Sequence, residues 1–116
     1  DAESERMFDA GVHPDFLLVD LKYQSALLNE KVEEQKSIKI DTVRELIKFS
    51  SLKPSYSSKK IIIVDDAEKM TTDAQNSILK TLEEPPENTI IILVTENINI
   101  LLPTIVSRCF NEVFKA

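Results

Sequence analysis

The fold is decided by the stretch Ile-Ile-Ile-Val-Asp-Asp at residues 61–66. Four consecutive β-branched residues with no polar alternation are typical of a central parallel strand that is buried on both faces. A second apolar run lies at residues 90–95, and the segment between the two carries apolar residues at helical spacing, namely Ala74, Ile78, Leu79 and Leu82. Strands that alternate with helices predict an α/β fold with a mostly parallel sheet.

Two shorter segments add strands on either side of this centre. Residues 16–21 form an apolar run, and residues 110–114 alternate between apolar and polar side chains. A short helix is expected before the last strand, over residues 101–107. The predicted strands are therefore 16–21, 60–65, 90–95 and 110–114.

Capping residues predict where the helices begin. We expect Asp41 to be the N-cap of a helix that reaches residue 51, because apolar residues at helical spacing follow it. Thr71 or Thr72 is expected to cap the next helix, which ends before a pair of prolines. Residues 22–38 are polar and predict only one or two helical turns.

Composition limits the classes of function. The chain has 116 residues, 42% of them hydrophobic, which suits one domain or most of one. Cys109 is the single cysteine, so an intrachain disulfide is impossible and a reducing, cytoplasmic setting is favoured. No apolar run approaches the roughly 20 residues of a membrane span, and no signal-peptide pattern opens the chain. A net charge of −6 disfavours wrapping of nucleic acid by the whole surface, although partners could supply positive charge.

The sequence lacks a phosphate-binding loop. A loop of the form G-x-x-x-x-G-K-[ST] needs two glycines, because backbone N–H groups must approach the phosphates without a Cβ in the way. Gly11 is the only glycine, and Val12, His13 and Pro14 follow it. These residues therefore cannot make a P-loop nucleotide hydrolase by themselves. Since the chain opens with Asp1 and a helix-like segment, we interpret it as a fragment of a longer protein.

Asp65 and Asp66 are the first candidates for chemistry. A buried parallel strand delivers its last residues to the sheet edge where ligands bind. Two carboxylates there could hold Mg²⁺ through water and orient an attacking water molecule. The alternative, which the sequence leaves equally open, is that the pair caps a helix and forms a solvated turn.

Ser107, Arg108 and Cys109 form the second candidate group. An arginine after a short helix could reach a phosphate, because its guanidinium is permanently charged and forks onto two oxygens. The alternative is an ordinary surface arginine. Cys109 is interpreted as a small buried residue rather than a nucleophile, because no histidine lies near it in the sequence. Three lysines flank the polar loop and are expected to be solvated, namely Lys53, Lys59 and Lys60.

Five motifs gain meaning in combination. They are His-Pro-Asp at 13–15, Ile-Lys-Ile-Asp-Thr-Val-Arg-Glu-Leu at 38–46, Ile-Ile-Ile-Val-Asp-Asp-Ala-Glu-Lys-Met at 61–70, Asn-Ser-Ile-Leu-Lys-Thr-Leu-Glu-Glu-Pro-Pro at 76–86 and Leu-Pro-Thr-Ile-Val-Ser-Arg-Cys at 102–109. Together they resemble the AAA+ domain of bacterial sliding-clamp loaders, which are subunits of the DNA polymerase III holoenzyme. The delta-prime type fits better than the gamma/tau type, which carries Asp-Glu at the strand end. Here Asp66 is shorter than a glutamate and would position water poorly.

The resemblance implies a three-layer α/β/α domain with parallel strands in the order 5-1-4-3-2. Residues 1–116 would form a partial AAA+ domain that lacks the first strand and the P-loop. The strand at 90–95 would then have an open edge, so we expect the fragment either to self-associate through that edge or to place the strand at 110–114 atypically. The family also carries a zinc module upstream of the His-Pro-Asp segment, outside this sequence.

The resemblance also implies a role for Arg108. Clamp-loader subunits form an arc with ATP at their interfaces, so Arg108 is expected to act in trans as an arginine finger on a neighbouring gamma/tau subunit. Ser107 and Cys109 would hold its backbone, and Thr95 matches the sensor position. ATP and Mg²⁺ would belong to the neighbour, with no cofactor in this chain, which is not expected to be catalytic by itself within the DNA-directed DNA polymerase holoenzyme. Expected partners are gamma/tau, delta, the sliding clamp and, through the assembly, primed DNA, with no membrane.

Three alternatives remain open at this point. One is an ATP-hydrolysing gamma/tau subunit whose P-loop lies outside the sequence. Another is a phospho-receiver signalling domain, which would need an acceptor aspartate where the strand at 90–95 ends in Thr95. The third is an α/β fragment with no site of its own.

Overall fold

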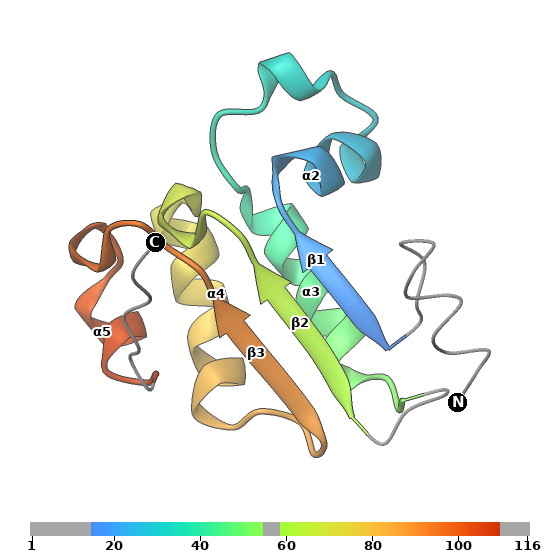
Figure 1. The fold of residues 1–116 in the computed structure, drawn as a ribbon, viewed down its shortest axis with the longest axis vertical. Helices are drawn as coiled ribbons and strands as arrows, with labels where there is room; N and C mark the ends of the chain where they lie inside the picture. Colours follow the sequence, from blue (N-terminus) through green and yellow to red (C-terminus); the bar gives the residue numbers. More distant parts are fainter. Residues whose placement is uncertain (1–14, 55–58, 110–116) are drawn as a thin grey trace.

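A parallel β-sheet forms the centre of the protein. The computed structural model describes residues 15–54 and 59–109, and within them three strands lie in the order β1-β2-β3 (Figure 1). The predicted α/β class with a parallel sheet is confirmed. The elements in chain order are β1 (Phe16–Val19), α2 (Leu21–Leu28), η1 (Val32–Glu34), α3 (Ile40–Ser51), β2 (Lys60–Val64), η2 (Ala67–Lys69), α4 (Thr72–Glu83), β3 (Thr89–Leu93), η3 (Ile98–Ile100) and α5 (Pro103–Val106).

The strands lie where their apolar runs predicted them. β1 and β2 begin as expected, β3 begins one residue earlier, and all three end one or two residues before the predicted bound. β1 ends early because Asp20 caps α2, with its carboxylate accepting a hydrogen bond from the backbone N–H of Tyr23 at 2.7 Å. The predicted strand at 110–114 lies outside the described residues, as do Gly11 and His13.

One face of the sheet carries the hydrophobic core. β2 is the central strand, and its Ile62 pairs in register with Leu17 of β1 and Ile91 of β3. Successive side chains of a strand alternate between faces, so these residues share one face. Helices α3 and α4 lie behind the sheet in Figure 1 and cover this face. The buried hydrophobic residues are Val19, Ile38, Val43, Leu46, Ile62, Val64, Ala67, Met70, Ala74, Ile78, Leu101 and Ile105.

The opposite face of the sheet is less covered by the described residues. Ile63 pairs with Leu18 and Ile92, which are 42% and 44% exposed. The prediction that residues 61–64 are buried on both faces is therefore wrong for the described part of the chain. Burial along β2 alternates, because α3 and α4 cover one face only. The second helical layer of the predicted α/β/α arrangement is not among the described elements, and β3 forms an edge of the described sheet.

The helix caps were predicted in one case and not in the other. Thr71 caps α4 as expected, because its hydroxyl accepts a hydrogen bond from the N–H of Ala74 at 3.1 Å. The expected N-cap role of Asp41 is wrong, since α3 begins at Ile40 and its N-cap position is Lys39. Asp41 lies in the first turn, where a carboxylate is favoured by the helix dipole.

Lys60 also departs from the sequence-based expectations. It is 1% exposed rather than solvated. Its Nζ donates hydrogen bonds to the carbonyls of Phe49 at 2.7 Å and Leu52 at 2.5 Å, at the end of α3. Carbonyls at a helix C-terminus lack partners within the helix and favour a cation. Burial lowers the pKa of Lys60, and the nearby Asp15 acts in the opposite direction.

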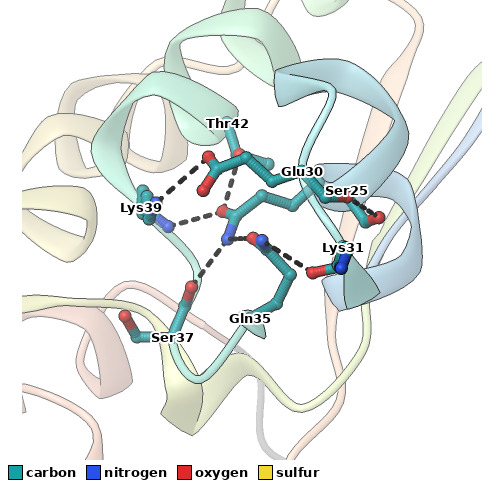
Figure 2. A network of polar contacts seen from close by, with 8 residues as sticks. Ser25, Glu30, Lys31, Gln35, Ser37, Lys39 and Thr42 are labelled. Carbon is teal, nitrogen blue, oxygen red and sulfur yellow. Dashed lines mark hydrogen bonds and ion pairs between the residues drawn. The ribbon is translucent and has the colours of Figure 1, made fainter. Parts of the chain in front are cut away.

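The buried side-chain amide of Gln24 organises residues 22–38, for which the sequence predicted only one or two helical turns (Figure 2). The side-chain oxygen of Gln24 accepts hydrogen bonds from the N–H of Lys39 and the hydroxyl of Thr42, both at 2.7 Å. Its nitrogen donates to the side chain of Gln35 at 2.6 Å and to the carbonyl of Ser37 at 2.8 Å. Both hydrogens and both lone pairs of the amide therefore have partners.

The same segment contacts the turn that follows β2. Ile38 lies between the two backbone positions that Gln24 holds, and its own N–H donates to the carbonyl of Lys69 at 2.8 Å. Its carbonyl accepts from the N–H of Thr71 at 3.0 Å, which makes an isolated parallel bridge with Met70. The start of α3 is thus tied on one side to α2 and on the other to the turn after β2.

Candidate functional site

Asp65 and Asp66 form a tight turn at the carboxyl end of β2. The N–H of Asp65 continues the ladder to β1 by donating to the carbonyl of Val19 at 2.9 Å. The carboxylate of Asp65 accepts a hydrogen bond from the N–H of Asp66 at 2.9 Å. Asp66 has a left-handed backbone with φ 53° and ψ 48°, and its carboxylate pairs with Lys69 at 3.5 Å. The geometry matches the turn interpretation of this pair.

Thr95 meets this turn through a different carboxylate. Its hydroxyl donates a hydrogen bond to Oε1 of Glu68 in η2 at 2.7 Å and accepts one from the N–H of Asn97 at 3.1 Å. The backbone supports the same contact, since Ala67 donates its N–H to the carbonyl of Val94 at 2.8 Å. The segments that follow β2 and β3 are therefore linked by the hydrogen bond between Glu68 and Thr95, and not by the two aspartates.

Both aspartates of the acidic turn have partners within the chain. One carboxylate oxygen of Asp65 is occupied by a backbone N–H, and the carboxylate of Asp66 faces the ammonium of Lys69. Magnesium is usually bound through one or two carboxylates, and waters and substrate phosphates complete its near-octahedral geometry. Within residues 15–54 and 59–109, no group of three or more His, Cys, Asp or Glu side chains is arranged to hold a metal ion.

Helix α5, which presents Arg108, is held by a second buried amide. Gln75 of α4 is 4% exposed, and its side-chain oxygen accepts a hydrogen bond from the N–H of Leu102 at 2.8 Å. Its nitrogen donates to the carbonyl of Met70 at 3.1 Å. Ile105 is fully buried and anchors the inner side of α5. The short helix therefore has a fixed position against α4.

Arg108 lies just beyond α5 and pairs with Glu83, the last residue of α4. The Nε and Nη2 atoms of Arg108 both lie 2.9 Å from Oε1 of Glu83. The two side chains are 44% and 45% exposed. A longer contact of 3.4 Å joins Nη1 to the hydroxyl of Ser107. The guanidinium thus lies at the surface and is paired with Glu83.

Ser107 and Cys109 continue the helical turn around Arg108. The N–H of Ser107 donates to the carbonyl of Pro103 at 3.0 Å, and the N–H of Cys109 donates to the carbonyl of Val106 at 3.2 Å. Cys109 is half-buried, and this burial raises the pKa of its thiol. A raised thiol pKa lowers the thiolate fraction at neutral pH, as is typical of an inert cysteine.

The fold separates Arg108 from the acidic turn. Helix α4 begins after the turn that follows β2, has 12 residues and ends at Glu83, before the start of β3. A helix of that length spans about 18 Å. The end of α4, at Glu83, therefore lies near the amino ends of the strands (Figure 1). Asp65 and Asp66 follow the carboxyl end of β2, and Thr95 follows that of β3. The candidate residues form two groups, not one site.

Sequence reasoning missed the partners that fix these groups. Glu68 and Glu83 belong to motifs that were recognised, but no local spacing pairs them with Thr95 and Arg108, which lie 27 and 25 residues further along the chain. Nothing in the local sequence of Gln24 or Gln75 indicates that their side-chain amides are buried and hydrogen-bonded. In each case the contact exists only once distant elements pack together.

The described fold is an α/β domain whose parallel sheet ends in an acidic turn, with an exposed arginine at the far end of the adjacent helix. The sequence profile of the family described as DNA polymerase III, delta subunit, matches residues 1–116. The chain belongs to this family. The family membership leaves no room for the receiver-domain alternative.

Individual relatives agree with that placement. The chain is 34% identical over 107 residues to DNA polymerase III subunit delta' of Pseudomonas aeruginosa, which is 92% of this chain and 30% of that protein. It is 36% identical over 104 residues to the delta' subunit of Bacillus subtilis, covering 90% of this chain and 28% of that protein. It is also 41% identical over 76 residues to subunit tau of Bacillus subtilis, covering 66% and 13%. The relatives matched over most of this chain make it a delta-prime-type member.

A solved structure shares the fold. A DNA polymerase III gamma-subunit-related protein from Thermotoga maritima superimposes with a TM-score of 0.75 and 38% identity, covering 89% of this chain and 31% of that chain. The chain spans 30% and 28% of the lengths of the two delta' relatives. In the part of the chain that the structure describes, no helix combines the length and apolar character that a membrane crossing requires.

Proposed function

We propose that the protein is a delta-prime subunit of a bacterial clamp loader and that Arg108 acts in trans as an arginine finger at the ATP site of a neighbouring gamma/tau subunit. The observation that carries the proposal is the position of Arg108. It lies at the surface, beyond the end of α5, and is separated by the length of α4 from the acidic turn of its own chain. An arginine so placed is exposed to another chain and lies far from the acidic turn of its own chain.

The chemistry of Arg108 and of the acidic turn supports different roles for them. The guanidinium is permanently charged and can fork onto two phosphate oxygens. The acidic turn, by contrast, engages its carboxylates with Lys69 and with its own backbone. ATP and Mg²⁺ therefore belong to the gamma/tau neighbour in this proposal. The delta subunit, the sliding clamp and primed DNA complete the cytoplasmic assembly, whose partners offset this chain's net charge of −6.

The test is the Arg108→Ala variant of the full-length subunit in a reconstituted loader. An arginine finger contributes about 10³–10⁵-fold to phosphoryl transfer. We expect single-turnover hydrolysis at the gamma/tau site that faces Arg108 to fall by at least about 10³-fold. Lys80→Ala, which removes one exposed positive charge from α4, is the matched control and should leave the rate unchanged. Unchanged DNA- and clamp-stimulated hydrolysis by Arg108→Ala would refute the assignment.

A gamma/tau-like ATPase is the second candidate, because the identity to subunit tau reaches 41% over 76 residues. It predicts that the full-length protein binds ATP and hydrolyses it alone. Asp66 argues against this, because it is shorter than the glutamate of the gamma/tau type and would position water poorly. Equilibrium binding of a fluorescent ATP analogue to the isolated full-length subunit separates the two candidates.

A further inference from the structure

We propose that Glu83 is a positioning residue for Arg108. In this view Glu83 holds one edge of the guanidinium so that the other edge is presented, already oriented, to a phosphate group outside the chain. The inference rests on the proposed function of Arg108 and adds a second residue to it.

A single oxygen of Glu83 contacts one side of the Arg108 guanidinium. Oε1 of Glu83 lies 2.9 Å from both Nε and Nη2 of Arg108. In a planar guanidinium the Nε–H and one Nη2–H point from the same side edge, so a single carboxylate oxygen engages that whole edge. One hydrogen bond from Nε and one ion-pair contact from Nη2 engage the same side edge, so together they orient the plane of the guanidinium and the direction of its tip.

The end edge of the guanidinium, formed by Nη1 and Nη2, differs from the side edge that Glu83 contacts. Each of Nη1 and Nη2 carries a further hydrogen on this edge, which lies farthest from the backbone. No carboxylate of the described residues pairs with it, and Nη1 has only the 3.4 Å contact with Ser107. Two parallel N–H groups match two oxygens of a phosphate. Glu83 can therefore stay in place while the end edge binds a phosphate of a nucleoside triphosphate.

Packing between α4 and α5 holds Glu83 and Arg108 near each other. Its position is set by α4, and α5 is tied to α4 through Gln75 and Leu102. Both partners of the ion pair are thus mounted on elements that are fixed to each other. Both side chains are nearly half exposed, so the pair contributes little to folding stability. Because the pair adds little stability at so exposed a place, we attribute to it the orientation of the guanidinium.

The experiment uses full-length subunit variants in the reconstituted loader. We expect Glu83→Ala to lower the single-turnover rate at the facing gamma/tau site by about ten- to a hundredfold, the cost of a misplaced catalytic group. The KM for ATP should change little, because the arginine acts on the transferring phosphoryl group. Glu84→Ala is the matched control, since Glu84 is the adjacent exposed residue of the same motif, and its rate should equal that of the unmodified subunit.

Two backgrounds separate positioning from a general structural effect. Glu83→Ala should have no further effect in the Arg108→Ala background, and a reduced effect in the Arg108→Lys background, because lysine has no side edge for Glu83 to hold. If Arg108→Ala lowers the rate and Glu83→Ala behaves like Glu84→Ala, the inference on Glu83 is wrong and the role of Arg108 stands. If Arg108→Ala is silent, the proposed function itself fails. A rate increase in Glu83→Ala, or a loss that persists without Arg108, would also overturn the positioning role.

Discussion

The hydroxyl of Thr95 donates a hydrogen bond of 2.7 Å to Oε1 of Glu68, 27 residues earlier in the chain. This contact joins the end of β3 to the short helix η2 that follows β2. Thr95 occupies the position that resembles a nucleotide sensor, yet its partner is a carboxylate of the same chain. In this subunit we therefore interpret the pair as a structural closure of the sheet edge.

Removing that hydroxyl should cost stability. We expect Thr95→Val to lower the free energy of unfolding by about 1 kcal/mol, because Glu68 loses a hydrogen-bond donor in a half-buried place. Urea denaturation followed by circular dichroism measures the change. Thr89→Val is the control, since the Thr89 hydroxyl makes only an exposed 3.4 Å contact with the carbonyl of Glu87. Equal stability losses in the two variants would contradict the closure role.

The left-handed backbone of Asp66 makes a second prediction. Its φ is 53°, a region that glycine enters freely and alanine does not. Asp66→Gly and Asp66→Ala lose the same ion pair with Lys69, so their difference isolates the backbone. We expect the glycine variant to be more stable by about 1 kcal/mol in urea denaturation.

Position 73 provides the control for that comparison. Asp73 lies in the first turn of α4, where glycine is less favourable than alanine. The order of the two variants should therefore reverse at Asp73. The same order at both positions would mean that Asp66 is not held in the left-handed conformation.

The predictable part of this fold is the part that local sequence encodes. The apolar runs located all three described strands, and the stripe through Ala74 and Ile78 located α4, because burial of one face leaves a periodic signal. Thr71 was found as a cap because its partner lies three residues away. Asp65 and Asp66 were correctly placed at a strand end, with the turn interpretation left open.

Two of the errors have a different origin, which is contact between residues of separate elements. Lys60 reads as a solvated lysine until the end of α3 comes within reach of its ammonium group. The N-cap of α3 is Lys39 rather than Asp41, and the N–H of Lys39 donates to the side chain of Gln24, 15 residues away. Hydropathy and capping rules contain no information on such partners, so only the packed structure reveals them.

Burial of Cys109 predicts a poorly reactive thiol. Burial raises the pKa of this thiol above its usual value of 9.0, so the thiolate fraction at neutral pH is smaller than for a free cysteine. We expect slow alkylation by iodoacetamide near neutral pH, with a rate that still increases with pH at 9.0. Mass spectrometry follows the reaction, and Cys109→Ser should abolish it for this residue. A rate that levels off below that pH would contradict the prediction.

The same shift has a consequence for stability. An acid whose pKa is raised in the folded state ionises first in the unfolded state, so the unfolded state is favoured as pH rises. Between the unfolded and folded pKa values of Cys109, the free energy of unfolding should therefore fall with rising pH, starting near 9.0. The fall due to this group should be absent in Cys109→Ser, which makes the comparison of the two proteins the measurement.

Gln24 should be among the polar residues whose loss destabilises this domain most. Removal of its amide leaves the N–H of Lys39, the hydroxyl of Thr42 and the carbonyl of Ser37 without their partner in a buried place. Each buried unsatisfied group costs about 1–3 kcal/mol, and part of that cost is relieved by relaxation or water. We expect Gln24→Ala to lower the free energy of unfolding by about 3 kcal/mol.

Amide hydrogen exchange shows which residues lose protection in Gln24→Ala, whereas the free energy of unfolding reports only the global change. In Gln24→Ala the amide of Lys39 loses its acceptor, and the amide of Ile38, which donates to Lys69, should lose protection with it because the two are adjacent. Amides at the centre of β2 should change only by the global loss. Lys22→Ala, on the exposed side of α2, is the matched control and should stay within about 0.5 kcal/mol of the unmodified protein. If Gln24→Ala exchanges like Lys22→Ala at Ile38 and Lys39, then the start of α3 is held by its own packing, and the amide of Gln24 does not tie it to α2.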